Sequence, residues 1–280
     1  LNMYKTKGKV SDLEAFIGEK DISGTIGIAH TRWATHGVPN NVNAHPHFSQ
    51  SQNIALIHNG IIENYSTIKE ELLSRGYTFE SDTDTEVLVQ LIEDIKINEK
   101  VDLEEAVRIA LNQVIGAYAI VVISKDHPDM LVAARKGSPL VVGIGEDEFF
   151  LASDAAPIIE YTKDVIYVNE KEIVCVKRGE PVKIKTIENK PTTPYIQTLE
   201  MNISQLEKGG YDHFMLKEIY EQPRSILDSL RGRINANEGY VKLGGISDYD
   251  QKMANARRII IVACGTSWHA GLVGEYLIED

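Results

Sequence analysis

The chain has 280 residues, of which 43% are hydrophobic and 25% charged, values that are ordinary for a soluble globular protein with one large or two modest domains. Its net charge of -12 argues against a nucleic-acid backbone as the main partner. The basic, polar start, Leu1–Lys9, lacks the apolar region of a signal peptide, and no apolar run approaches the length of a membrane span, so we expect no membrane contact.

The first part of the chain mixes strand and helix patterns. Ile26–Ala34 and Asn53–Ile62 are short apolar runs that end in polar loops, which predicts two buried strands. Thr83 and Glu86 have the spacing of a capping box, and an apolar stripe follows them at helical intervals. Helices are predicted at Ser66–Arg75, Thr83–Ile97 and Leu103–Ile115.

From residue 117 the pattern changes to short β-rich runs separated by turn residues. Helices and antiparallel-type strands in one domain indicate a layered α+β fold over residues 1–192. A linker is predicted at 193–213, with prolines at its start and glycines near its end. The predicted strands are Ala117–Ser124, Met130–Lys136, Leu140–Ile144, Glu148–Ala152, Val165–Asn169, Glu172–Lys177 and Val182–Thr186.

The last part of the chain, residues 214–280, has an α/β pattern. Phe214–Leu230 is predicted to be a helix, and Arg257–Cys264 a buried strand that leads into a polar loop. Residues 268–280 then carry apolar side chains at helical spacing. Because one strand and one helix cannot bury both of their faces, this second domain is expected to be incomplete.

Three polar segments carry residues suited to binding one small amino acid. Arg32 follows a predicted strand, and its planar guanidinium matches an α-carboxylate. Asp84 lies in the first turn of a predicted helix and offers an anion to an α-ammonium group. Asn59 and Gly60 place a side-chain amide beside a flexible backbone N–H, a pair that suits the oxyanion formed when a carboxamide is attacked.

Each of these residues, taken alone, also has a structural interpretation. An isolated Asn-Gly pair is most often a turn, an aspartate favours a helix N-terminus, and Arg32 and Trp33 suit an ion pair and a core position. Five histidines between His30 and His58 raise the question of a metal. No helical His-Glu motif or cysteine cluster accompanies them, so we expect structural, hydrogen-bonding histidines, no metal and no cofactor.

The segments IAHTRWATHG (28–37), HNGIIEN (58–64) and SDTDTEV (81–87) occur together and in order. They resemble the glutamine pocket of the class II glutamine amidotransferases, and within that group the glutaminase half of the glucosamine 6-phosphate synthase family. The resemblance implies an N-terminal-nucleophile hydrolase fold with four αββα layers.

The same resemblance implies a role for each matching residue. Arg32 would bind the carboxylate of glutamine, and Asp84 would bind its amino group. Asn59 and Gly60 would form the oxyanion hole. The loop that closes over glutamine would include Trp33, Thr35 and His36.

In this family the nucleophile is a cysteine at the very N-terminus, whereas the chain begins at Leu1. Cys175 lies in a β-rich run, where a core thiol is expected, and Cys264 belongs to the second domain. Two distant cysteines fit a reducing, cytoplasmic compartment. We expect the chain to be a fragment that lacks on the order of 40 residues before Leu1 and has no glutaminase activity by itself.

Ala263–Ser267 joins the last predicted strand to a helix, whose N-terminal N–H groups suit a phosphate. The segment resembles the first sugar-isomerase (SIS) motif of the same family, so Gly265, Thr266 and Ser267 would bind fructose 6-phosphate. The family implies a homodimer that passes ammonia from glutamine to fructose 6-phosphate and makes glucosamine 6-phosphate for hexosamine biosynthesis. Two alternatives stay open: a class II amidotransferase with another acceptor, and a non-catalytic regulator that binds glutamine or a sugar phosphate.

Overall fold

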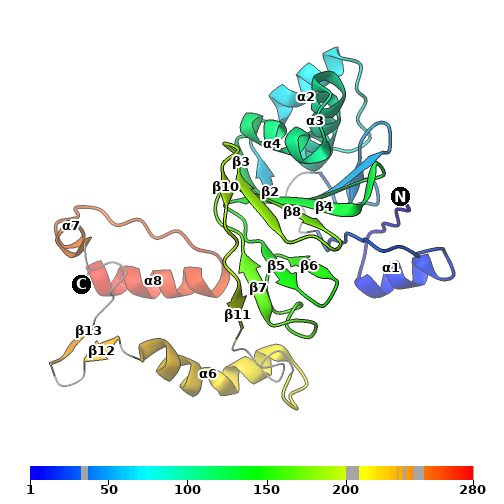
Figure 1. Ribbon diagram of the computed structural model, residues 1–280. Coiled ribbons are helices and arrows are strands. Elements are labelled where there is room, and N and C mark those ends of the chain that lie inside the picture. The colour runs from blue at the N-terminus through cyan, green and yellow to red at the C-terminus, as the bar shows by residue number, and fades with distance from the viewer. Residues whose placement is uncertain (33–36, 200–207, 232, 236–237, 242–248, 280) are drawn as a thin grey trace. The chain divides into compact units, whose positions relative to one another are not determined.

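The structure, a computed structural model, describes all residues except 33–36, 200–207, 232, 236–237, 242–248 and 280 (Figure 1). The chain divides into two compact units, Leu1–Glu207 and Lys208–Asp280. None of the described helices is both long enough and apolar enough to cross a membrane.

The first unit contains short helices and strands in the order that the sequence indicates. It begins with α1 (Val10–Ile17), a helix that is not among the predicted elements. The predicted elements between residues 53 and 186 are confirmed, with ends that differ by a few residues. They are β2 (Ile54–Ile62), α2 (Tyr65–Ser74), α3 (Asp84–Glu99), α4 (Leu103–Gln113), β3 (Gly116–Ser124), β4 (His127–Lys136), β5 (Val141–Ile144), β6 (Phe149–Ala152), β7 (Asp164–Tyr167), β8 (Glu172–Lys177) and β9 (Lys183–Thr186). Three two-residue strands complete the unit: β1 (His47–Phe48), β10 (Pro191–Thr192) and β11 (Gln197–Thr198).

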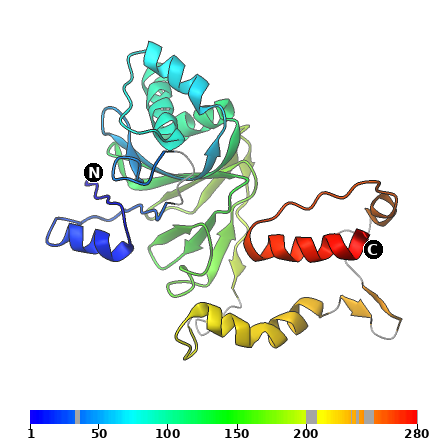
Figure 2. The same cartoon turned by 180° about the vertical axis from the view of Figure 1, so that it is seen from behind.

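Two antiparallel sheets form the centre of this unit. The larger has the order β1-β2-β3-β4-β8-β9-β10, and the smaller has the order β11-β7-β5-β6. Helices α2, α3 and α4 cover one face of the larger sheet, and the smaller sheet lies on the other side, as Figure 2 shows from behind. This arrangement of helices and antiparallel sheets confirms the α+β class.

Strand β3 shows why both faces of the larger sheet are buried. Ile120 and Val122 belong to the core beneath the helices, whereas Ala119 and Val121 belong to the core between the two sheets. Successive side chains of a strand point to opposite faces, so an uninterrupted apolar run serves both cores. Cys175 on β8 is buried, as predicted, and burial raises the pKa of its thiol to about 12.

Helix α3 is fixed at its start by a cap and along its length by buried polar side chains. Thr83 accepts the backbone N–H of Glu86 at 3.2 Å, which confirms the predicted cap. Glu86 accepts the N–H of Ser81 at 2.6 Å, and Glu93 accepts the N–H of Ser51 at 3.1 Å. These buried acceptors tie α3 to the loop before it and to the turn between β1 and β2, so its first turn is held beside β2.

Two predicted strands are wrong. The described residues 26–32 of the first one pair with no strand, although Ile26 and Ile28 are partly buried. Residues 257–264 are also not a strand, and Ile260 and Val262 are 70% and 89% exposed. An apolar run becomes a strand only where another strand bonds to its backbone, and the described residues provide none at either place.

The described part of the second unit consists of two longer helices, one short helix and two two-residue strands. They are α6 (Phe214–Leu230), β12 (Ile234–Asn235), β13 (Tyr240–Val241), α7 (Asp250–Ala254) and α8 (Gly265–Glu279). The helices predicted at 214–230 and after residue 268 are confirmed by α6 and α8. The stretch 193–213, predicted as a linker, includes β11, which pairs with β7 of the first unit, and it spans the division between the units.

Candidate functional site

A pocket of about 320 Å³ opens where the first turn of α3 faces the C-terminal half of β2. It brings together four residues that the sequence analysis singled out for binding or catalysis: Arg32, Asn59, Gly60 and Asp84. Three others, Trp33, Thr35 and His36, lie outside the described residues. The remaining lining residues are His30, His45, His58, Ile61, Thr83 and Thr85.

Asp84 is the anion of the pocket. It is the first residue of α3, directly after the cap residue Thr83, and it is only 4% exposed. Its Oδ2 accepts the backbone N–H of Ile62 at 2.8 Å and lies 3.9 Å from Nδ1 of His58. The helix N-terminus favours a negative charge at this point, so a buried carboxylate is stabilised facing the pocket.

Asn59 and Gly60 lie inside strand β2, so the Asn-Gly pair is not a turn. Asn59 pairs with Ala119 and Gly60 with Tyr118 across the ladder to β3. Gly60 has a φ of 143°, and a Cβ at this position would lie 2.1 Å from the carbonyl oxygen of Ala117. Only glycine fits such a close approach of two strands, which explains the residue type at this position.

Arg32 is the cation of the pocket. Its Nη2 donates to the carbonyl oxygen of Gly37 at 3.4 Å. Burial lowers the pKa of the guanidinium, and the negative charge of Asp84 opposes this effect. A guanidinium and a carboxylate therefore act on the same small volume, an arrangement that suits a zwitterion.

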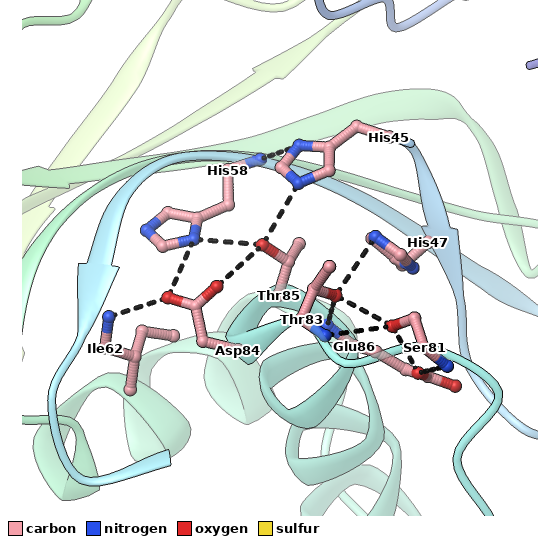
Figure 3. A network of polar contacts seen from close by, with 9 residues as sticks. All are labelled: His45, His47, His58, Ile62, Ser81, Thr83, Asp84, Thr85 and Glu86. Carbon is pink, nitrogen blue, oxygen red and sulfur yellow. Dashed lines mark hydrogen bonds and ion pairs between the residues drawn. The ribbon is translucent and has the colours of Figure 1, made fainter. Parts of the chain in front are cut away.

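Histidine and threonine side chains connect the walls of the pocket (Figure 3). Oγ1 of Thr85 lies 3.1 Å from Nδ1 of His58, 3.3 Å from Nε2 of His45 and 3.4 Å from Oδ1 of Asp84. Nδ1 of His45 accepts the backbone N–H of His58 at 3.4 Å, so the proton of the neutral ring is on Nε2 and points at Thr85. One hydroxyl thus joins β2, the loop before β1 and α3.

The buried and half-buried imidazoles of this region have lowered pKa values, which keeps these rings neutral near pH 7. Burial, which is the largest cause, lowers the pKa of His30 to about 4 together with the neighbouring His58 and Arg32. Burial likewise lowers the pKa of His47 to about 3, and it lowers the pKa of His45 strongly. Neutral rings keep one nitrogen as an acceptor, as the hydrogen bonds of His45 require.

These lowered pKa values predict that acid destabilises the first unit. In the unfolded chain a histidine binds its proton near pH 6.5, roughly the reference value, whereas folded His30 and His47 do so only near pH 4 and 3. Between these limits the unfolded state binds more protons, so the free energy of unfolding falls as the pH falls. The slope is at most about 1.4 kcal/mol per pH unit for each such histidine.

Denaturant titrations between pH 7 and 4.5 measure this slope. His47→Gln is expected to make the slope of the free energy of unfolding against pH shallower, by the amount that the uptake of about one proton contributes, because a titrating group is lost. His213→Gln is the matched control, since His213 is exposed and belongs to the second unit. A free energy of unfolding that stays constant over this range would contradict the burial of neutral histidines.

The sequence predicts these histidines to be structural, so His30, His45, His58 and Thr85 are pocket residues that it does not mark as such. The available signal for His30, His58 and Thr85 was their position inside the three polar segments, whereas His45 lies outside all three. Among the described residues, no group of three His, Cys, Asp or Glu side chains is arranged to hold a metal. None of the described residues that line the pocket is a cysteine.

The second predicted constellation begins helix α8 in the other unit. Gly265 is its first residue, with a φ of 58°, and it is followed by the exposed Thr266 and Ser267. Cys264, immediately before them, is exposed. The loop therefore presents backbone N–H groups and two hydroxyls at a helix N-terminus.

Comparison with known proteins identifies relatives over the whole chain. Residues 17–224 match the family model described as "Glutamine amidotransferase domain". Over its full length the chain is 62% identical to glutamine–fructose-6-phosphate aminotransferase (isomerizing) of Bacteroides thetaiotaomicron and 55% identical to the protein of that name from Chlorobaculum tepidum, and it covers 46% of each. The protein of the same name from Thermus thermophilus is 47% identical, with 45% covered. The chain thus spans about half the length of the curated relatives that it matches.

Among solved structures, the chain is similar to glutamine phosphoribosylpyrophosphate amidotransferase from B. subtilis, with a TM-score of 0.47 and 25% identity. The similarity covers 56% of this chain and 34% of that one.

Proposed function

The chain belongs to the glutamine amidotransferase domain family, and we propose that its pocket binds L-glutamine. The observation that carries the proposal is the placement of Arg32, Asp84 and the Asn59-Gly60 pair around one cavity of about 320 Å³. In this proposal Arg32 pairs with the α-carboxylate and Asp84 with the α-ammonium. The carboxamide then lies at Asn59 and Gly60, which donate to its oxygen.

Loop residues are part of this proposal. Trp33, Thr35 and His36 follow Arg32 directly in sequence, and we propose that they contact glutamine as the corresponding family segment does. The nucleophile would be a cysteine at the start of the mature longer protein, with its own α-amine as the base.

Calorimetric titration of the 280-residue chain tests the binding. L-Glutamine is expected to bind, and D-glutamine, L-asparagine and L-norleucine are expected to bind more weakly. They lack, respectively, the right configuration, the right length and the carboxamide that Asn59 and Gly60 would hold. Equal affinity for all four, or no binding of L-glutamine, would overturn the proposal.

Replacing Arg32 by lysine is expected to weaken the binding of L-glutamine by about tenfold or more. Lysine keeps the positive charge, but it loses the planar fork that meets both oxygens of a carboxylate. The control is Arg178→Lys, because Arg178 is exposed on the turn between β8 and β9. If Arg32→Lys binds glutamine as the wild type does, the carboxylate is recognised by another group.

For the longer protein we propose the reaction that the names of its relatives indicate. Ammonia released from glutamine would aminate fructose 6-phosphate and give glucosamine 6-phosphate for hexosamine biosynthesis. The identity to three proteins of that name over the entire chain supports this acceptor. The loop at Gly265, Thr266 and Ser267 would hold the phosphate, as the start of a SIS domain that follows the glutaminase domain and its linker.

An acceptor panel with the full-length protein tests this part of the proposal. When fructose 6-phosphate is the acceptor, glutamate release is expected to be accompanied by formation of glucosamine 6-phosphate. When phosphoribosyl pyrophosphate is the acceptor, no aminated product is expected. Amination of another acceptor alone would point to a different amidotransferase. Glutamine binding without turnover would point to a regulator.

We also propose that the full-length protein is a homodimer and that it is cytoplasmic. Light scattering of the full-length protein would check the first point, and fractionation of cells would check the second.

A further inference from the structure

His30 and Arg32 are two residues apart, and the imidazole of His30 binds the backbone of Arg32. Its Nδ1 accepts the N–H of Arg32 at 2.8 Å. Arg32 has a φ of 27°, in the left-handed region that a residue with a Cβ seldom adopts. Aspartate and asparagine hold tight turns in the same way, by accepting an N–H two residues further along. The hydrogen bond therefore stabilises a backbone shape that Arg32 would otherwise avoid.

The ring of His30 is itself held in place. It is half-buried and packs against the ring of His45, with a distance of 4.6 Å between the centroids and an angle of 33° between the planes. His45 is fixed from both of its nitrogens, by the backbone N–H of His58 on β2 and by the hydroxyl of Thr85 on α3. The contacts lead from two rigid elements to the turn at Arg32.

We propose that His30 is a positioning residue for Arg32, whose imidazole holds the left-handed turn that directs the guanidinium into the pocket. The proposal rests on the proposed function, in which Arg32 binds the α-carboxylate of glutamine. His30 acts through Arg32, so its loss is expected to affect only the binding of the α-carboxylate of the ligand.

The acceptor atom defines a test with two variants of nearly the same shape. In asparagine Oδ1 is attached to Cγ, as Nδ1 is in histidine, so His30→Asn keeps an acceptor near the N–H of Arg32. Leucine has the branched outline of asparagine but no acceptor. His30→Leu therefore removes the hydrogen bond, and His30→Asn is the matched control that retains it.

Two ligands separate positioning of Arg32 from general damage to the pocket. L-Glutamine carries the α-carboxylate, and L-glutaminamide replaces it with an uncharged carboxamide. Calorimetric titration of the 280-residue chain with each ligand compares the wild type with the two variants. His30→Leu is expected to weaken L-glutamine about tenfold, while His30→Asn stays within about threefold of the wild type. L-Glutaminamide is expected to bind all three proteins with similar affinity.

Several results would overturn the inference. They are unchanged glutamine affinity in His30→Leu, an equal loss for both ligands, or a loss in His30→Asn as large as in His30→Leu. If His30→Leu does not fold, His30→Gln takes its place, because its amide oxygen is one bond further from the backbone and is expected to miss the N–H. Failure of the wild type itself to bind glutamine would overturn the proposed function, whereas wild-type binding with any of these results overturns only the role of His30.

Discussion

Replacing Gly60 by alanine is expected to destabilise the first unit by about 3 kcal/mol or more. Gly60 has a φ of 143°, and an added Cβ would lie 2.1 Å from the carbonyl oxygen of Ala117 and 2.9 Å from the Cα of Tyr118. These atoms are backbone of the paired strand β3, so they cannot move aside as a flexible side chain would. Strands β2 and β3 would separate where the proposed oxyanion pair lies.

Denaturant unfolding, followed by circular dichroism, measures this loss. Gly27→Ala is the matched control, because no described atom lies within 4 Å of a Cβ built there and its φ is not positive. The control is expected to change the free energy of unfolding by less than about 0.5 kcal/mol. A Gly60→Ala protein that is as stable as the control would contradict the close pairing of β2 and β3 at this point.

Local signals in the sequence were enough to predict the start of helix α3. Thr83 and Glu86 have the spacing of a cap, and the structure has that hydrogen bond. The same kind of local pattern failed for residues 26–32 and for Ile259–Val262, which are apolar but pair with no strand among the described residues. A helix satisfies its backbone within its own segment, whereas a strand depends on a neighbour that a local pattern does not reveal.

The distribution of strands between two sheets was equally beyond the local pattern. Strand β4 pairs with β8, and the strands between them form part of the other sheet. Alternation and turn residues look the same in both sheets, so the sequence predicts the strands but not their partners. Two sheet layers were expected from the family resemblance alone, and the structure shows them in β3, whose two faces belong to different cores.

The candidate site shows the same division between residue types and geometry. The order of the polar segments selected Arg32, Asn59, Gly60 and Asp84, which all line the pocket. The contact between the hydroxyl of Thr85 on α3 and the ring of His45 joins residues that are 40 positions apart in the sequence. No spacing rule connects such distant residues. Charged residues that bind a ligand can be recognised in the sequence by their type. The residues that hold them in position are found only from the structure.

Replacing Asp84 by asparagine is expected to weaken L-glutamine binding by about 100-fold, or roughly 2.7 kcal/mol. Asparagine keeps an oxygen that can accept the N–H of Ile62, now bound at 2.8 Å, so the start of α3 is largely preserved. The negative charge proposed to pair with the α-ammonium is lost, however. Because Asp84 is only 4% exposed, solvent does little to screen the missing interaction.

A ligand without the ammonium group shows whether the loss of the negative charge of Asp84 causes the weaker binding. 4-Carbamoylbutanoate is glutamine without its α-amino group, and it is expected to bind Asp84→Asn at least as well as the wild type. Asp82→Asn is the matched control, since Asp82 is exposed, two residues before Asp84. If Asp84→Asn weakens both ligands equally, the carboxylate serves the fold of the pocket and not the ammonium. If it weakens neither, glutamine is held by other groups, and the pairing of Arg32 and Asp84 around one amino acid must be abandoned.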